Sequence, residues 1–248
     1  MLKEAIDRIV GLALAPTVSE IDGRRFYVTP AGAHVQEVKD EEPACLAVSQ
    51  LRAIVDFLRD VKDKGIASKT GRFIHVHSPA SVTVYTEADV HQDRIALLEA
   101  IFKAPLALNS GSWYDQESFV IGLQACFVTS TDRTRLLSLA GTVKGEASTQ
   151  GSDDGVTQVV ATRNGAVLSV ETVVNNPFML APRRTFPEVE QPASPFVLRL
   201  KNNGPDKVPS LGLFLADGGA WELEAVANIA KWLRAALKEA QIVCPVLA

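Results

Sequence analysis

Two histidines separated by one residue are the best-placed groups for chemistry in this chain, His75 and His77 in the run Ile74-His75-Val76-His77. Residues two apart in a β-strand point to the same face, so both imidazoles can reach one ion. Such a pair holds a divalent metal when a neighbouring strand supplies a third ligand. The candidates for that ligand are His91, Asp89 and Asp93. Polar alternation on a half-exposed strand explains the same pattern, because His-x-His also recurs by chance.

Two adjacent arginines, Arg183 and Arg184, form a candidate site for anion or partner binding, extended by Lys201 or Lys207. They stand in a proline-rich segment, residues 175–194, which we expect to run extended along a surface. Glu188 and Glu190 follow closely and offer a structural salt bridge instead. No aromatic residues are interleaved with the arginines, so stacking of single-stranded nucleic acid is not indicated.

Composition restricts the partners that the chain can attract. The 25 basic and 29 acidic residues give a formal net charge of −4, so nucleic acid remains open as a partner but is not indicated by charge. The three cysteines are scattered, which predicts reduced thiols and a cytoplasmic protein. We expect neither export nor membrane insertion, since the first residues are charged and no apolar run is long enough. Nucleotide-binding and hydrolase motifs are absent, and we expect no cofactor.

The first part of the chain predicts helical structure with one short strand. Apolar residues at helical spacing predict a helix over residues 2–14, followed by a strand over 25–28 and a loop over 31–44. A second helix is marked by the apolar residues Leu46, Leu51, Ile54, Val55, Leu58 and Val61. We expect residues 1–70 to form an N-terminal segment that continues into residues 71–248 as one domain.

The middle of the chain predicts a meander, a helical hairpin and a β-hairpin. Alternating apolar residues predict strands over 73–78, 81–86 and 94–102, although the last run also fits a helix. Asp115 can cap one helix, and Thr131 or Asp132 can cap a second. Two further strands, over 156–162 and 167–174, flank the turn pair Asn164-Gly165.

Two apolar strands and one long helix end the chain. The strands cover residues 196–200 and 211–216, and the helix covers 220–240 with Val226, Ile229, Leu233 and Leu237 facing inward. Trp232 lies beside that stripe, where it can face a second subunit, so we expect a homo-oligomer. The predicted fold class is α+β: antiparallel sheet with amphipathic helices packed on it and a long C-terminal helix.

The order of these elements resembles the YfdQ-like family of uncharacterised phage and prophage proteins over roughly residues 73–237. The runs that carry the resemblance are Phe119-Val120-Ile121-Gly122-Leu123-Gln124, Arg184-Thr185-Phe186-Pro187-Glu188-Val189 and the strand-to-helix ending. The resemblance implies a cytoplasmic protein of infected bacterial cells, often encoded near replication and recombination genes. It supplies no catalytic or binding residues.

These observations favour a non-enzymatic phage accessory protein that acts by binding and self-association, in phage DNA metabolism or host takeover. One alternative is a protein that sequesters a nucleotide signal or inhibits a host defence protein through Arg183 and Arg184. A second alternative is a metal-dependent enzyme that uses His75 and His77. The partner would accordingly be a host or phage protein, or a nucleic acid.

Overall fold

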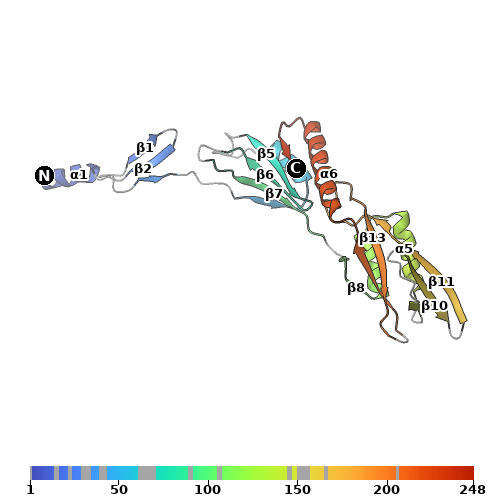
Figure 1. Cartoon of the computed structure of the whole chain (residues 1–248). Coiled ribbons are helices and arrows are strands. Elements are labelled where there is room, and N and C mark those ends of the chain that lie inside the picture. The colour runs from blue at the N-terminus through green and yellow to red at the C-terminus, as the bar shows by residue number, and fades with distance from the viewer. Residues whose placement is uncertain are drawn as a thin grey trace. The chain divides into compact units, whose positions relative to one another are not determined.

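The structure is a computed structural model that describes residues 2–13, 17–21, 24–28, 35–38, 44–60, 71–88, 92–104, 108–143, 147–149, 157–164, 167–204 and 207–248. The chain divides into two compact units, residues 1–43 with 63–69 and residues 44–62 with 70–248 (Figure 1). Residues 44–60 therefore group with the C-terminal region, whereas the sequence analysis placed them in an N-terminal segment, 1–70, that continues into residues 71–248 as one domain.

The first unit contains one helix and one small antiparallel sheet. Helix α1 spans Leu2–Ala13, as predicted, and the sheet has the order β1-β2-β3 with β1 at Thr17–Ile21, β2 at Arg24–Val28 and β3 at Val35–Glu37. Strand β3 lies inside the segment that was expected to be a loop. Large apolar side chains of this unit are exposed, namely Leu2, Ile6, Val10, Val18, Ile21, Tyr27 and Val35. The first unit thus has apolar surface that a partner can bury.

The second unit contains a five-stranded mixed sheet in the order β15-β5-β6-β7-β4. The predicted meander is confirmed by β5 (Arg72–Ser78), β6 (Ser81–Thr86) and β7 (Ala96–Ile101). Strand β4 (Leu46–Val48) runs parallel to β7, and β15 (Val246–Leu247) runs parallel to β5. Residues 46–48 were expected in a helix, but that helix, α2, begins only at Arg52 and ends at Asp60.

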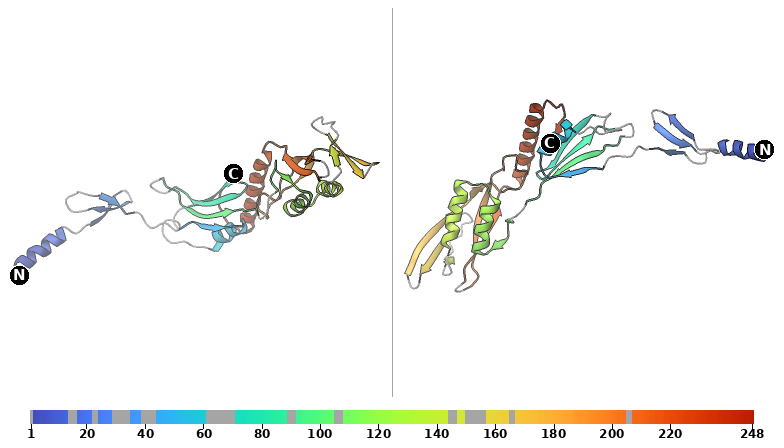
Figure 2. Two further views of the ribbon diagram at one scale, coloured as in Figure 1. Left: turned by 90° about the horizontal axis from the view of Figure 1, so that it is seen from below. Right: turned by 180° about the vertical axis from the view of Figure 1, so that it is seen from behind.

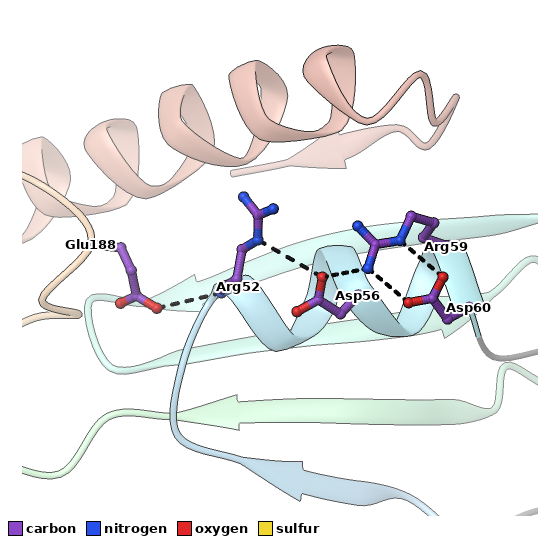
Figure 3. A network of polar contacts seen from close by, with 5 residues as sticks. All are labelled: Arg52, Asp56, Arg59, Asp60 and Glu188. Atoms are coloured by element: carbon purple, nitrogen blue, oxygen red, sulfur yellow. Dashed lines mark hydrogen bonds and ion pairs between the residues drawn. The ribbon is translucent and has the colours of Figure 1, made fainter.

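Helices α2 and α6 (Ala220–Glu239) pack on this sheet. Figure 3 shows α2 lying along the strands with α6 beside it. The side chains under the helices are fully or almost fully buried: Ile74, Val76, Val82, Val84, Leu98 and Ala100. The predicted inward residues Ile229, Leu233 and Leu237 of α6 are also buried, so the long C-terminal helix is part of the core.

The second unit also contains a four-stranded sheet in the order β12-β13-β14-β8. Its strands are β12 (Phe178–Leu180), β13 (Ser194–Lys201), β14 (Ser210–Leu215) and β8 (Trp113–Tyr114). Helices α4 (Gln116–Cys126) and α5 (Thr131–Thr142) pack on one face of it, around Phe119, Leu123 and Leu136. Figure 2 (right) shows this region from the side opposite to Figure 1.

Side-chain caps begin both helices of the predicted helical hairpin. The carboxylate of Asp115 accepts a hydrogen bond from the backbone N of Ser118, as the sequence predicted for α4. For α5 the cap is Ser130, whose hydroxyl accepts from the backbone N of Arg133. Thr131 and Asp132, the expected caps, are instead the first residues of the helix. The Asp132 carboxylate accepts from the backbone N of Met179 and thereby attaches β12 to α5.

The predicted β-hairpin is also present. It consists of β10 (Thr157–Asn164) and β11 (Val167–Asn175), with β9 (Ala147–Thr149) paired to β10. Gly165, in the expected turn, lies outside the described residues. The chain combines antiparallel and mixed sheets with helices, which pack on the five-stranded and four-stranded sheets, so the α+β class is confirmed. In the described part of the chain, no helix has both the length and the apolarity required to cross a membrane.

Candidate functional site

His75 and His77 project from β5 on the face opposite to Ile74 and Val76, which are buried under the helices. The two imidazole rings are in contact, with 4.0 Å between their centres. The Nε2 atom of His77 lies 3.3 Å from the hydroxyl oxygen of Tyr85 on β6. The predicted pairing of the two histidines on one strand face is therefore confirmed.

Aromatic and polar side chains surround the histidine pair. Phe73 stacks on Tyr85 with 5.6 Å between ring centres, and the Glu99 carboxylate accepts a 2.9 Å hydrogen bond from the Ser81 hydroxyl. Partial burial, together with the neighbouring His75, lowers the pKa of His77, although Glu99 acts in the opposite direction. His77 therefore favours the neutral form, which is the form that binds metals.

Within the described ranges of the chain, no third metal ligand is found beside the pair. His91 and Asp89, two of the candidates, lie outside the described residues. Among the residues that the structure describes, no group of three or more His, Cys, Asp or Glu side chains is placed to hold a metal ion. The metal site remains a prediction.

Arg184 is held in a network of structural contacts. The sequence suggested that it lies on an exposed segment, and this prediction is wrong. Its guanidinium carbon lies 3.9 Å from the ring centre of Trp221, the second residue of α6. Its Nη2 donates to the backbone oxygen of Pro192 and to the hydroxyl of Ser194. Burial lowers the pKa of Arg184 to about 10, opposed by nearby carboxylates of which Asp217 is the strongest. The physical reason for the difference is that the proline-rich segment folds back onto α6.

Arg183, in contrast, is exposed, as predicted. Its backbone N donates to the oxygen of Cys126 at 2.7 Å. A cavity of about 200 Å³ lies beside it, lined largely by apolar side chains that include Leu108, Phe127, Phe196 and Leu215. Both arginines contribute to the wall of this cavity. Binding at the pair remains a prediction, with Arg183 as the accessible member.

The sequence suggested a salt bridge between Glu188 and the two arginines, but Glu188 does not form it. Its Oε1 accepts a 3.4 Å hydrogen bond from the backbone N of Arg52, the first residue of α2 (Figure 3). A carboxylate at this position also complements the positive end of the helix dipole. The exposed ion pairs of Asp56 with Arg52 and Arg59 lie along the same helix and contribute little to stability.

One surface feature was missed by the sequence reasoning, an aromatic and basic row on the four-stranded sheet. Its members are Trp113, Arg199, Lys201 and Phe214, and they are called the aromatic–basic face below. Arg199 pairs with Gly212 and Gly212 pairs with Trp113, so this row crosses three strands on one face. The core of α4 and α5 lies on the other face, which carries Leu198, Leu200, Leu211 and Leu213.

The groups of the aromatic–basic face are close together. The ring centres of Trp113 and Phe214 are 5.5 Å apart in an edge-to-face arrangement. The Lys201 ammonium nitrogen lies 5.9 Å from the centre of the Trp113 ring. Trp113 is 40 % exposed, a large fraction for an indole in a folded domain. Lys201 was proposed as an extension of the arginine pair. Its aromatic neighbour, Trp113, is far away in the sequence, so the residues around Lys201 do not indicate the contact.

Gly212 makes room for this arrangement. A Cβ atom at position 212 would lie 3.1 Å from the Trp113 ring, 3.2 Å from the Phe214 ring and 3.1 Å from the Ser112 backbone oxygen. Glycine inside a strand often marks such a close approach. Gly212, the second residue of the apolar run 211–216, was a local signal that could have indicated a group lying across the strand.

Trp232 is half-buried on α6, beside the fully buried Leu233. Its proposed role in self-association therefore stays a prediction.

Comparison with known proteins finds no matching family model, no matching curated protein and no matching solved structure.

Proposed function

We propose that this protein is a non-enzymatic accessory protein that acts by binding and self-association. The observation that carries the proposal is the aromatic–basic face: Trp113 and Phe214 lie in contact on the strand face opposite to the helices. Tryptophan and arginine are enriched among the residues that dominate binding energy at interfaces. A half-exposed tryptophan next to a cation is accordingly more useful for binding than for stability.

The cellular setting follows from the resemblance to YfdQ-like phage and prophage proteins. It supports a role in phage DNA metabolism or host takeover, in the cytoplasm of an infected bacterium. The chemistry of the aromatic–basic face agrees with either role, because cations beside aromatic rings contact both nucleic acids and proteins.

Self-association is supported by the first unit. Leu2 and Ile6 of α1 are 79 % and 51 % exposed, and Val18 and Val35 of its sheet are each 59 % exposed. A helix of about 12 residues is marginal on its own in water, so tertiary or intermolecular packing must stabilise it. A second copy of the chain is the partner that we propose for these side chains.

A photo-reactive aromatic amino acid at position 113, which keeps a ring in the place of the Trp113 side chain, tests the binding role in expressing cells. We expect illumination to produce a covalent adduct at position 113 and none at Val243, which is fully exposed but far along the chain. Digestion with nuclease and with protease then identifies the class of the attached molecule. Equal labelling at both positions, or none at either, would contradict the proposal.

A second candidate function is a metal-dependent enzyme at His75 and His77, favoured by the 4.0 Å contact between the two rings. It requires ligands beyond this pair. Equilibrium dialysis against Zn²⁺ tests this candidate by measuring the number of ions bound per chain. A metal-dependent enzyme should bind one ion tightly, and the control variant His77→Ala should lose it.

A further inference from the structure

We infer that the aromatic–basic face is a binding site for single-stranded nucleic acid. This inference rests on the proposed function and names the class of ligand. Proteins that bind single strands combine aromatic side chains, on which bases stack, with cations that follow the phosphates. An antiparallel sheet that presents aromatic side chains on an uncovered face is one of the recurring forms of this site.

The aromatic pair supplies the stacking surface. Trp113 and Phe214 come from adjacent strands, β8 and β14, and their ring centres are 5.5 Å apart. The two rings meet at 67°, and Trp113, which is 40 % exposed, is the ring that we expect an incoming base to reach. Because every base has such a flat side, stacking of this kind tolerates any sequence.

Lys201 supplies a cation beside the aromatic pair. Lys201 is exposed at the end of β13, 5.9 Å from the Trp113 ring, and Arg199 stands two residues earlier on the same face. The described strand residues on this face include no Asp or Glu; besides the four members of the row they are Met179, Pro195, Val197, Ser210 and Gly212. Lys201 thus places a positive charge beside the aromatic pair, although the chain has a formal net charge of −4.

Single strands fit this face better than a duplex does. The bases of a duplex are stacked on each other and cannot lie on Trp113, whereas an unpaired base can. The overall negative charge also weakens non-specific attraction to duplex DNA, which depends on the number of phosphates neutralised. A protein partner would use the same tryptophan, and the experiment below separates these two occupants.

Fluorescence anisotropy of a labelled oligothymidylate of about 16 nucleotides, at about 50 mM salt, measures the binding of the full chain. We expect Trp113→Ala to weaken binding about tenfold, and Trp113→Phe to retain most of it, because one stacked base is lost only in the first variant. We expect Lys201→Ala to lower the slope of log affinity against log salt concentration by about 0.7, the value for one phosphate of a single strand.

The matched controls are Lys231→Ala, an exposed lysine on α6, and a duplex of the same length. Lys231→Ala should leave both affinity and salt slope unchanged, and the duplex should bind more weakly than the single strand. Circular dichroism checks that the Trp113→Ala variant keeps the wild-type fold.

The inference is overturned if the wild-type chain does not bind the oligonucleotide, or if a folded Trp113→Ala variant binds it as well as the wild type does. A protein adduct at position 113 without oligonucleotide binding would overturn the nucleic-acid assignment and leave the proposed function standing. An absence of any adduct at position 113 would contradict both.

Discussion

The guanidinium of Arg184 stacks on the indole of Trp221, with 3.9 Å from its central carbon to the ring centre. This contact attaches the proline-rich segment before β13 to the start of α6. The same arginine donates to Ser194, and the Ser194 hydroxyl donates to the Asp217 carboxylate at 2.5 Å. Burial acts to raise the pKa of Asp217, but hydrogen bonds from Ser194 and Gly219 outweigh it and hold the pKa below its usual range.

Arg184→Ala should therefore destabilise the fold, while Arg183→Ala should not. The first change removes a stacked cation and two donated hydrogen bonds, for which we expect a loss of about 1–3 kcal/mol in the free energy of unfolding. The second changes an exposed side chain, for which about 0.5 kcal/mol or less is typical. Urea unfolding of both variants measures the difference, and equal effects would show that the contact with Trp221 has no structural role.

Leu233→Ala should lower stability by about 2–5 kcal/mol, because it removes a fully buried side chain between α6 and the five-stranded sheet. Leu223→Ala on the same helix is the matched control, since Leu223 is 79 % exposed. Thermal unfolding followed by circular dichroism compares the two. A similar melting temperature for both variants would show that α6 is not part of the core.

The pH dependence of stability should include a contribution from His77. Its pKa is lowered in the folded chain, so the unfolded chain takes up the proton first as the pH falls. Stability is then complete above about pH 6.5, the ordinary histidine pKa, and decreases as the pH falls through that value and towards the lowered one.

Melting temperatures of wild type and His77→Asn between about pH 7.5 and 5.5 test this contribution. The variant should lose less stability than the wild type over the same interval. A larger loss in the variant would reverse the sign of the effect and assign His77 a favourable partner for its charged form.

Ile6→Glu should reduce self-association. Ile6 is 51 % exposed on α1, and burying such a side chain against a second copy contributes about 25 cal/mol for each Å² of apolar area. Light scattering of wild type, Ile6→Glu and the control Lys3→Glu measures the mass. Trp232→Ala tests the proposed interface on α6 in the same experiment. A wild-type mass equal to one chain would contradict self-association at either surface.

Chelator should leave the melting temperature unchanged, because two strand histidines and three scattered cysteines make a poor closed metal site. The measurement compares protein with and without a Zn²⁺ chelator. A drop of several degrees that disappears in a His75→Ala, His77→Ala double variant would instead establish a structural metal.

Elements that depend on neighbouring residues were predicted well. The alternation in 73–78 and 81–86 corresponds to β5 and β6, and the stripe of Ile229, Leu233 and Leu237 corresponds to the buried side of α6. Asp115 was recognised as a helix cap because its hydrogen bond reaches only three residues ahead. Such features follow from local backbone geometry and from the period at which apolar residues recur.

The sequence by itself thus determined the α+β class, the main strands and helices, and the shared face of His75 and His77. Only the tertiary structure decided that β4 and β15 complete the five-stranded sheet, that Arg184 is covered by Trp221, and that Trp113 lies beside Lys201. Each of these contacts joins segments far apart along the chain. Periodicity places a side chain on one face of its own element, whereas the element that comes to lie beside it is decided by the packing of the whole domain.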